Sequence, residues 1–236
     1  MHKILKILLV LVLVTFTSCS SKSGKSFNAN KTNLATIEFG KQDGKKIKWL
    51  VILDDETQQI LLSEKVLDVK LYNDADVKIS WDKTTLYDYL NSDFVNECFT
   101  KEERESLAFI NNENTDLVTL PTTDNLIDLY GTINYIIDGF YGKKDFFAPN
   151  ENILAYPMER AINNDIDPFD NKVFSEYLRV DVDSRYEYAN GAVPYWLLNQ
   201  SDSGLPLYVT STGYIDVTTA DTGYIGIRPI IKVVKK

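Results

Sequence analysis

Apolar and polar residues alternate at both ends of the chain, which is the pattern of half-buried β-strands. Near the start, residues 35–39, 47–53 and 59–63 lie between turn-forming residues and predict three consecutive antiparallel strands. Near the end, residues 195–234 are rich in β-branched and aromatic residues, interrupted at short intervals by Gly, Ser, Asp and Asn. This block predicts four short strands, at 195–198, 207–210, 214–217 and 224–232.

Helical spacing replaces this alternation in the middle of the chain. The expected helices of this region follow a threonine or, for the piece that contains Phe94, Val95, Cys98 and Phe99, Ser92. The hydroxyl of such a residue can accept a hydrogen bond from the first helical turn. We predict a helix after Thr84 or Thr85, a charged helix opened by a Thr100–Glu103 capping box, and a helix at 124–130 after Thr122 or Thr123.

From residue 131 to about residue 188 the periodicity is weak, and Gly, Pro and aromatic residues are scattered along the chain. This composition predicts long, ordered loops around a short helix at 156–162. Strands at both ends with short helices between them indicate an α+β domain whose terminal strands pair. A chain of 236 residues, 44% of them hydrophobic, is long enough to bury one such core.

The first residues predict a secretory signal. His2, Lys3 and Lys6 give a positive start, and residues 7–14 form an unbroken apolar run. That run is shorter than the roughly 20 residues that a permanent transmembrane helix needs. We therefore expect the N-terminal segment to direct export of the chain.

Small residues stand directly before a cysteine at the end of this signal, in the order Phe16, Thr17, Ser18, Cys19. The arrangement resembles the lipobox of bacterial lipoproteins, although Phe16 stands where that motif usually has leucine. The resemblance implies that the Cys19 thiol is lipidated and that cleavage makes Cys19 the new N-terminus. The alternative is an ordinary signal peptide with an incidental cysteine.

A polar stretch rich in Ser, Lys, Gly and Asn follows Cys19 and predicts a flexible tether. Acyl chains bind a membrane by about 0.8 kcal/mol per buried methylene, so two or three of them would anchor the protein durably. We therefore expect a protein of the bacterial cell envelope, periplasmic or surface-exposed. The predicted organisation is a lipoprotein signal peptide at 1–18, a tether at 19–34 and one domain at 35–236.

The charge and the cysteine content indicate whether nucleic acid is a partner and whether a reactive thiol is present. Cleavage before Cys19 would leave 34 acidic residues against 23 basic ones, a net charge of −11. A polyanion of this kind is a poor partner for nucleic acid, so we expect none. Cys98 would be the remaining cysteine, and because it lies among apolar residues we interpret it as a core residue rather than a reactive thiol.

The composition also excludes several classes of catalytic and metal site. The sequence has one histidine, His2, inside the expected signal, so the mature chain would lack the residue that Ser-His-Asp, Cys-His and His-zinc sites require. Two carboxylates alone can hydrolyse a glycoside, but the sequence selects no pair. The run at 54–56 is interpreted as a solvated turn.

Acidic and amide side chains gather at 163–171, where Asp165, Asp167 and Asp170 offer oxygen ligands of the kind that calcium prefers. The segment lacks the glycine and the terminal glutamate of an EF-hand loop. The preferred interpretation is a turn-rich surface loop without a cofactor, and a calcium site is the alternative.

Several short motifs in a fixed order resemble an uncharacterised bacterial family, the domain-of-unknown-function family numbered 6273. In the closing block the motifs are Tyr195-Trp-Leu, Ser211-Thr-Gly-Tyr-Ile and Gly226-Ile-Arg-Pro-Ile, and others run from about Thr36 onwards. That family's closing pattern is in turn similar to the C-type-lectin-like fold, including the branch of formylglycine-generating enzymes. The resemblance implies a C-type-lectin-like domain, but fold alone implies no activity.

The resemblance has consequences for single residues. Arg228 matches the family's arginine before proline, whereas Leu198 replaces an arginine that usually follows the Trp-Leu pair. For Arg228 we weigh a structural role, bonding loop carbonyls or a carboxylate such as Asp216, against a role in ligand binding. The enzymes of that branch rely on a cysteine pair, which Cys98 alone would not supply.

Tyrosines and a tryptophan in the closing block suggest a binding surface, because an aromatic ring offers a flat apolar face at low entropic cost. We select Tyr195, Trp196 and Tyr214, with Arg228, as candidate ligand-binding residues. The leading hypothesis is a non-catalytic module that binds a glycan, a peptide or a protein. The alternatives are a carboxylate-dependent hydrolase of envelope polymers and a purely structural envelope component.

Overall fold

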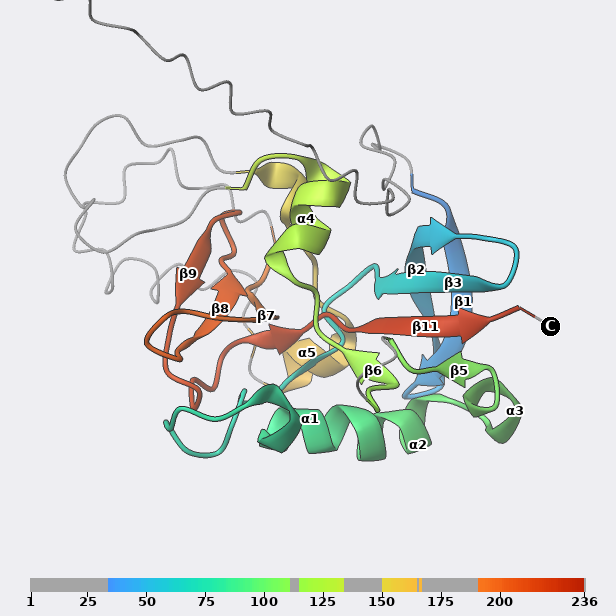
Figure 1. Ribbon diagram of the computed structural model, residues 1–236, viewed down its shortest axis with the longest axis horizontal. Helices are drawn as coiled ribbons and strands as arrows, with labels where there is room; N and C mark the ends of the chain where they lie inside the picture. Colours follow the sequence, from blue (N-terminus) through green and yellow to red (C-terminus); the bar gives the residue numbers. More distant parts are fainter. Residues whose placement is uncertain (1–33, 111–114, 134–149, 165, 167–190, 236) are drawn as a thin grey trace, which may run out of the picture.

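Two β-sheets, each assembled from strands far apart in the sequence, form the frame of the protein (Figure 1). The computed structural model describes residues 34–110, 115–133, 150–164, 166 and 191–235. Cys19, the predicted signal and all of the predicted tether except its last residue lie outside these residues, so their roles stay predictions.

The first sheet begins with the three strands expected from the sequence. Strands β1 (Thr36–Gln42), β2 (Lys45–Asp54) and β3 (Gln58–Ser63) pair antiparallel in chain order. The last strand of the chain, β11 (Ile230–Val234), then pairs antiparallel with β3. The expectation that strands from the two ends pair is therefore confirmed.

Two very short strands complete the first sheet on the far side of β11. Strands β5 (Leu107–Ala108) and β6 (Val118–Thr119) each pair antiparallel with a different part of β11. The strand order is β1-β2-β3-β11-β5, with β6 also on β11, so β11 lies in the middle of the sheet.

The second sheet has strand order β4-β10-β7-β8-β9. Its pairs are antiparallel except β10 with β7, which is parallel. The strands are β4 (Asp68–Val69), β7 (Tyr195–Gln200), β8 (Pro206–Val209), β9 (Ile215–Val217) and β10 (Gly226–Ile227).

The single closing strand predicted at 224–232 is wrong. The segment is two strands, β10 in the second sheet and β11 in the first, joined by Arg228 and Pro229. Proline has no N–H to donate to a ladder, so it suits the point where the chain leaves one sheet for the other. The carbonyl of Pro229 still accepts a hydrogen bond from Ser63 N at 2.9 Å.

A run of short helices lies along one side of both sheets (Figure 1). Its order is η1 (Trp81–Lys83), α1 (Thr85–Tyr89), a π-helical turn η2 (Leu90–Phe94) and α2 (Val95–Cys98), followed by α3 (Lys101–Arg104). Thr84 caps α1 through its side chain, and the capping box of Thr100 and Glu103 is present as expected.

The remaining helices are separate. Helix α4 (Thr123–Tyr130) begins after Thr122, whose side chain accepts a hydrogen bond from Asn125 N. A 3₁₀ turn, η3 (Glu151–Ile153), and α5 (Glu159–Asn163) follow. The helix predicted at 156–162 is therefore shorter and begins later, because residues 156–158 are held extended by hydrogen bonds to Val66.

The second sheet is buried on both faces at its centre. Along β7, Trp196 packs into the core shared with the helical run, while Tyr195 and Leu197 pack into a second core on the opposite face. Consecutive strand residues point to opposite faces, so an unbroken apolar run is what such a strand requires. The result is an α+β domain that is mostly β, with a few short helices.

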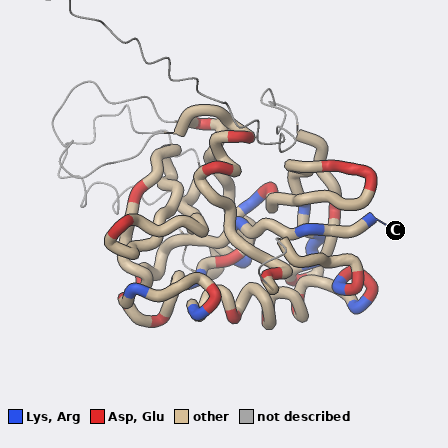
Figure 2. Tube along the Cα trace, in the orientation of Figure 1, with Lys and Arg blue, Asp and Glu red and all other residues tan. Residues whose placement is uncertain are grey.

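Lys, Arg, Asp and Glu are interspersed along the chain, in turns and helices alike (Figure 2). Within the described parts of the chain, no helix is long and apolar enough to span a bilayer.

Candidate functional site

The candidate ligand-binding residues of the closing block lie in the interior. Tyr195 and Trp196 are fully buried, Arg228 is 2% exposed and Tyr214 is 8% exposed. The prediction that they form a surface platform is therefore at odds with the structure. The physical reason is the double-sided burial of β7, which the apolar run Tyr195-Trp-Leu-Leu already indicated.

Arg228 joins three elements by hydrogen bonds to neutral groups. Its Nε donates to Ser63 O at 3.0 Å, and its terminal nitrogens donate to the hydroxyls of Tyr195 at 3.2 Å and Tyr130 at 3.4 Å. The guanidinium also lies 5.2 Å from the centroid of the Tyr195 ring. Bonding to loop carbonyls was one of the two structural roles considered; the carbonyl that Arg228 bonds belongs to Ser63, the last residue of β3. These contacts make Arg228 part of the scaffold.

The calcium candidates Asp165, Asp167 and Asp170 lie outside the described residues, so that hypothesis stays a prediction. Among the residues that are described, no group of three or more His, Cys, Asp or Glu side chains is placed to hold a metal ion.

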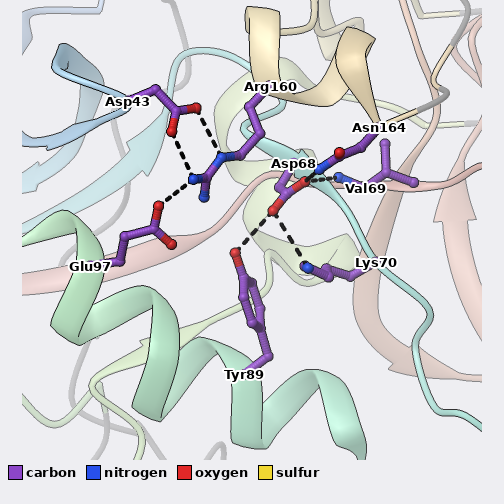
Figure 3. Close-up of polar contacts among 8 residues, drawn as sticks. All are labelled: Asp43, Asp68, Val69, Lys70, Tyr89, Glu97, Arg160 and Asn164. Carbon is purple, nitrogen blue, oxygen red and sulfur yellow. Dashed lines mark hydrogen bonds and ion pairs between the residues drawn. The ribbon is translucent and has the colours of Figure 1, made fainter.

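A polar cluster joins the β1–β2 turn, β4, the helical run and α5 (Figure 3). At its centre is Asp68, a carboxylate that is 1% exposed. One oxygen accepts hydrogen bonds from Val69 N at 2.8 Å and Asn164 Nδ2 at 2.6 Å, and the other accepts one from Tyr89 OH at 3.0 Å. Burial removes the water that would otherwise hydrate a carboxylate, so its oxygens need hydrogen-bond donors within the protein.

Lys70 closes the cluster on its solvent side. Its ammonium lies 3.8 Å from the second Asp68 oxygen and 4.4 Å from the centroid of the Tyr89 ring. Burial, followed by the negative charge of Asp68, raises the pKa of the Tyr89 hydroxyl. Tyr89 therefore stays protonated and serves as a hydrogen-bond donor to Asp68 over the physiological pH range.

Arg160 of α5 makes a second set of contacts beside Asp68. Its guanidinium donates two hydrogen bonds to the Asp43 carboxylate, at 2.9 and 2.8 Å, and pairs with Glu97 of α2. The hydrogen bond with Glu97, with further help from Asp43, raises the pKa of Arg160. We call Arg160, Asp43 and Glu97 the clasp.

Helix α5 is held mainly by polar contacts of this kind. Glu159 pairs with Lys45 of β2, and Asn164, just past the helix, bonds Asp68. Ala161 is the one buried residue within α5. Ionic contacts near the surface contribute about 1 kcal/mol or less each, so α5 is bound more weakly than the strands of the two sheets.

Cys98 lies on the inner side of this cluster and is 3% exposed. Burial, followed by the charge of Glu97, raises the pKa of its thiol to about 12. The thiol is therefore protonated and unreactive at neutral pH, which agrees with its interpretation as a core residue.

Gln42, the last residue of β1, is 1% exposed. Within the described part of the chain, neither its amide nitrogen nor its amide oxygen meets a hydrogen-bond partner. Leaving a buried polar group unsatisfied costs about 1–3 kcal/mol, so such a group calls for an explanation.

A second carboxylate, Asp116, stands apart from this cluster. It is buried, and its Oδ2 accepts a hydrogen bond from Trp81 Nε1 at 3.1 Å. Burial raises the pKa of Asp116, while the hydrogen bonds from Trp81 and Tyr87 oppose that shift. Trp81 and Tyr87 are partly exposed and meet edge to face, with centroids 5.8 Å apart.

Sequence reasoning missed the cluster around Asp68. A signal was present, because Asp68 interrupts the apolar run Val66-Leu67-Asp68-Val69, and a charged residue inside a buried strand must find partners. The identity of those partners carries no such signal, since Tyr89 and Asn164 are 21 and 96 residues away.

Comparisons of the chain with protein-family models, with curated proteins and with solved structures find no match. What the protein does therefore has to be proposed from its own residues.

Proposed function

We propose that the protein is a lipid-anchored component of the bacterial cell envelope whose folded domain binds a ligand without transforming it. The observation that carries the proposal is the order of features at the N-terminus: a basic start, an apolar run of about eight residues, small residues before Cys19, and a polar tether. The first strand of the fold, β1, begins at Thr36, after all of these features.

The non-catalytic part of the proposal is supported by how the buried polar groups are used. The oxygens of Asp68 are occupied by donors from Val69, Asn164 and Tyr89, and the Cys98 thiol has its pKa raised to about 12. A catalytic carboxylate or thiol needs a free oxygen or an accessible thiolate. These two groups are arranged to hold the fold together.

A C-type-lectin-like scaffold, in the manner of the family numbered 6273, is part of the same proposal. Supporting it are the pairing of β11 with β3 and the second sheet of short strands. Scaffolds with short strands and long connections present their ligands to loops. In this protein the binding surface has to lie outside the buried side chains of Tyr195, Trp196, Tyr214 and Arg228.

The anchor is tested by growing the source bacterium with radiolabelled palmitate and isolating the protein from membrane and soluble fractions. We expect label in the membrane-bound protein and none in a Cys19→Ala variant. An unlabelled protein in the cytosol would refute the anchor. For binding, the mature lipoprotein in detergent micelles is applied to glycan and peptide arrays, where a folded protein that binds nothing would count against a binding module.

One observation favours a carboxylate-dependent hydrolase as a second candidate. Asp116 has a raised pKa and lies beside the partly exposed rings of Trp81 and Tyr87, and a general acid needs a raised pKa beside a surface that can seat a substrate. Under this alternative, Asp116→Asn abolishes turnover of an envelope glycan while Asp82→Asn does not. Absence of turnover by the unaltered protein would exclude the alternative for the glycans tried.

A further inference from the structure

Five aromatic rings in contact form a continuous path from the helical run to the second sheet. In order, they belong to Tyr87, Trp81, Tyr72, Trp196 and Tyr208, and we call them the aromatic path. Successive ring centroids are 5.8, 5.7, 5.5 and 6.2 Å apart. Every step along the path is therefore a direct contact between two rings, edge to face or tilted.

The aromatic path begins and ends near the surface and crosses the interior between. Tyr72 and Trp196 are fully buried, whereas the other three rings belong to partly exposed residues. Trp81 and Tyr87 lie in the helical run, in η1 and α1, and Tyr208 lies in β8. The path thus connects two separate places at which a solute can meet the protein.

A carboxylate stands at each end of the aromatic path. Trp81 Nε1 donates a hydrogen bond to Asp116 Oδ2 at 3.1 Å. Tyr208 OH donates one to Asp216 Oδ2 at 3.3 Å. A carboxylate in this position can take the proton itself when the ring loses an electron, because oxidation makes an indole N–H or a phenol O–H strongly acidic.

The two buried rings have partners of a different kind. Trp196 Nε1 donates to the carbonyl of Lys70 at 2.8 Å, and Tyr72 OH donates to the carbonyl of Leu198 at 3.3 Å. A backbone carbonyl accepts the hydrogen bond but is too weak a base to keep the proton. An oxidised ring is therefore stabilised by proton loss at the ends of the path and not in its middle.

Core packing alone also produces ring contacts of this geometry. It does not require a carboxylate at each end, and burial of the Asp116 carboxylate costs free energy that an apolar residue would avoid. The placement of proton acceptors at both ends of the path is the observation that packing leaves unexplained.

We propose that the aromatic path conducts a single electron from Tyr208 to Trp81, so that a one-electron oxidant of the radical class that arrives at Trp81 oxidises Tyr208 in its place. The direction follows from chemistry, because a tyrosine that can release its proton is slightly easier to oxidise than a tryptophan. This inference goes beyond the proposed function and does not rest on it.

The oxidant takes one electron from the Trp81 indole, whose N–H proton passes to Asp116. An electron from Tyr208 then reaches Trp81 through the two buried rings, and Asp116 returns the proton to the indole nitrogen. The phenolic proton of Tyr208 passes to Asp216. The products are the reduced oxidant, a tyrosyl radical at Tyr208 and a protonated Asp216. A thiol or phenol in solution can return a hydrogen atom to Tyr208, while Asp216 releases its proton to water.

Pulse radiolysis tests this path. The full-length protein, in micelles of a detergent without aromatic groups, is exposed to a pulse of azidyl radicals, which oxidise accessible tryptophan. The sequence has three tryptophans, and because Trp49 and Trp196 are fully buried, the first radical forms at Trp81. All measurements are made in a Tyr87→Phe background, which removes the tyrosine beside Trp81. We expect tryptophanyl absorption to decay and tyrosyl absorption to grow at one rate, independent of protein concentration.

Matched substitutions separate the path from the rest of the core. Trp196→Phe keeps a ring in the path but removes its oxidisable group, so it should slow the conversion at least tenfold. Trp49→Phe, the same change at a fully buried tryptophan outside the path, should leave the rate unchanged. Tyr208→Phe should remove the delayed tyrosyl signal, and Asp216→Asn, whose amide cannot take the proton, should slow its growth several-fold.

Equal rates in Trp196→Phe and Trp49→Phe would overturn the inference and leave the rings as core packing. A rate proportional to protein concentration would also overturn it, because the transfer would then run between molecules. If Trp196→Phe does not fold, Tyr208→Phe decides, since Tyr208 is partly exposed and phenylalanine preserves its ring. A delayed tyrosyl signal that persists in Tyr208→Phe likewise contradicts the path.

Discussion

Arg228 and Arg160 join distant segments in two different ways. Arg228 is 2% exposed and bonds a carbonyl and two hydroxyls, all neutral, on β3, β7 and α4. Arg160 has a side chain 21% exposed and bonds two carboxylates that are themselves half exposed. The first arginine is committed to the fold, because its partners would be left unsatisfied in the interior without it.

The difference between the two arginines indicates which part of the protein can open without unfolding of the whole. Charges near the surface can exchange a protein partner for water at little cost, while a buried guanidinium cannot. The frame around Arg228 should therefore unfold as one unit with the sheets, and α5 should open more easily than the rest.

Among these variants, Arg228→Lys should give the largest loss of unfolding free energy. Lysine keeps the buried charge but has one nitrogen in place of three, so it cannot reach Ser63 O, Tyr195 OH and Tyr130 OH together. We expect about 3 kcal/mol of lost unfolding free energy, measured by urea denaturation. A loss no larger than that of Arg160→Lys would erase the contrast between the two arginines.

Tyr195→Phe should cost about 2 kcal/mol, because the hydroxyl donates to Ile153 O at 2.7 Å and accepts from Arg228 in the interior. The matched control is Tyr156→Phe, because Tyr156 is 47% exposed and its hydroxyl can be solvated by water. We expect less than about 0.5 kcal/mol for the control. Equal losses in the two variants would show that burial of the hydroxyl does not matter.

Measurements of the unfolding free energy at alkaline pH should show whether water reaches the buried Cys98 thiol beside the clasp. The Cys98 thiol has its pKa raised by burial from 9.0 to about 12, so the folded state favours the protonated thiol. Its contribution to stability is complete below pH 9 and is lost progressively as the pH rises to 12.

At pH 10 this loss amounts to about 1.4 kcal/mol relative to pH 7. Cys98→Ala should reduce the difference in unfolding free energy between pH 7 and pH 10 by that amount, since alanine does not titrate. Tyr195 and Tyr72, whose pKa values burial raises to about 12, remain in both proteins as a common background. An unchanged difference would mean that water reaches the thiol.

Arg160→Met should have the smallest global effect, about 1 kcal/mol or less at low salt and less still at 1 M salt. Locally the effect should be clear, because hydrogen exchange of the α5 amides should accelerate while that of β3 and β11 does not. Parallel acceleration in the strands would show that α5 belongs to the same unit as the frame.

The parts of the fold that local sequence determines could be predicted. Strands β1 to β3 follow from alternation and turn residues, and the Thr100–Glu103 box forms between residues three apart. The closing segment could not be divided correctly between two sheets, because its composition is the same on either side of Arg228 and Pro229.

The contacts of the candidate site could not be predicted from the sequence, for a related reason. Arg160 meets Asp43 across 117 residues, and the sequence carries no pattern that links them. Aromatic content alone pointed to Tyr195 and Trp196, but aromatic residues fill cores as well as binding surfaces, and here burial on both faces of β7 decided the outcome.

The position of β11 determines when the first sheet can be completed during synthesis. Residues 230–234 supply the strand between β3 and β5, so the first sheet stays open until this segment has left the ribosome. Nascent chains and premature-stop products shortened before Ile230 should remain protease-sensitive, however many residues they contain.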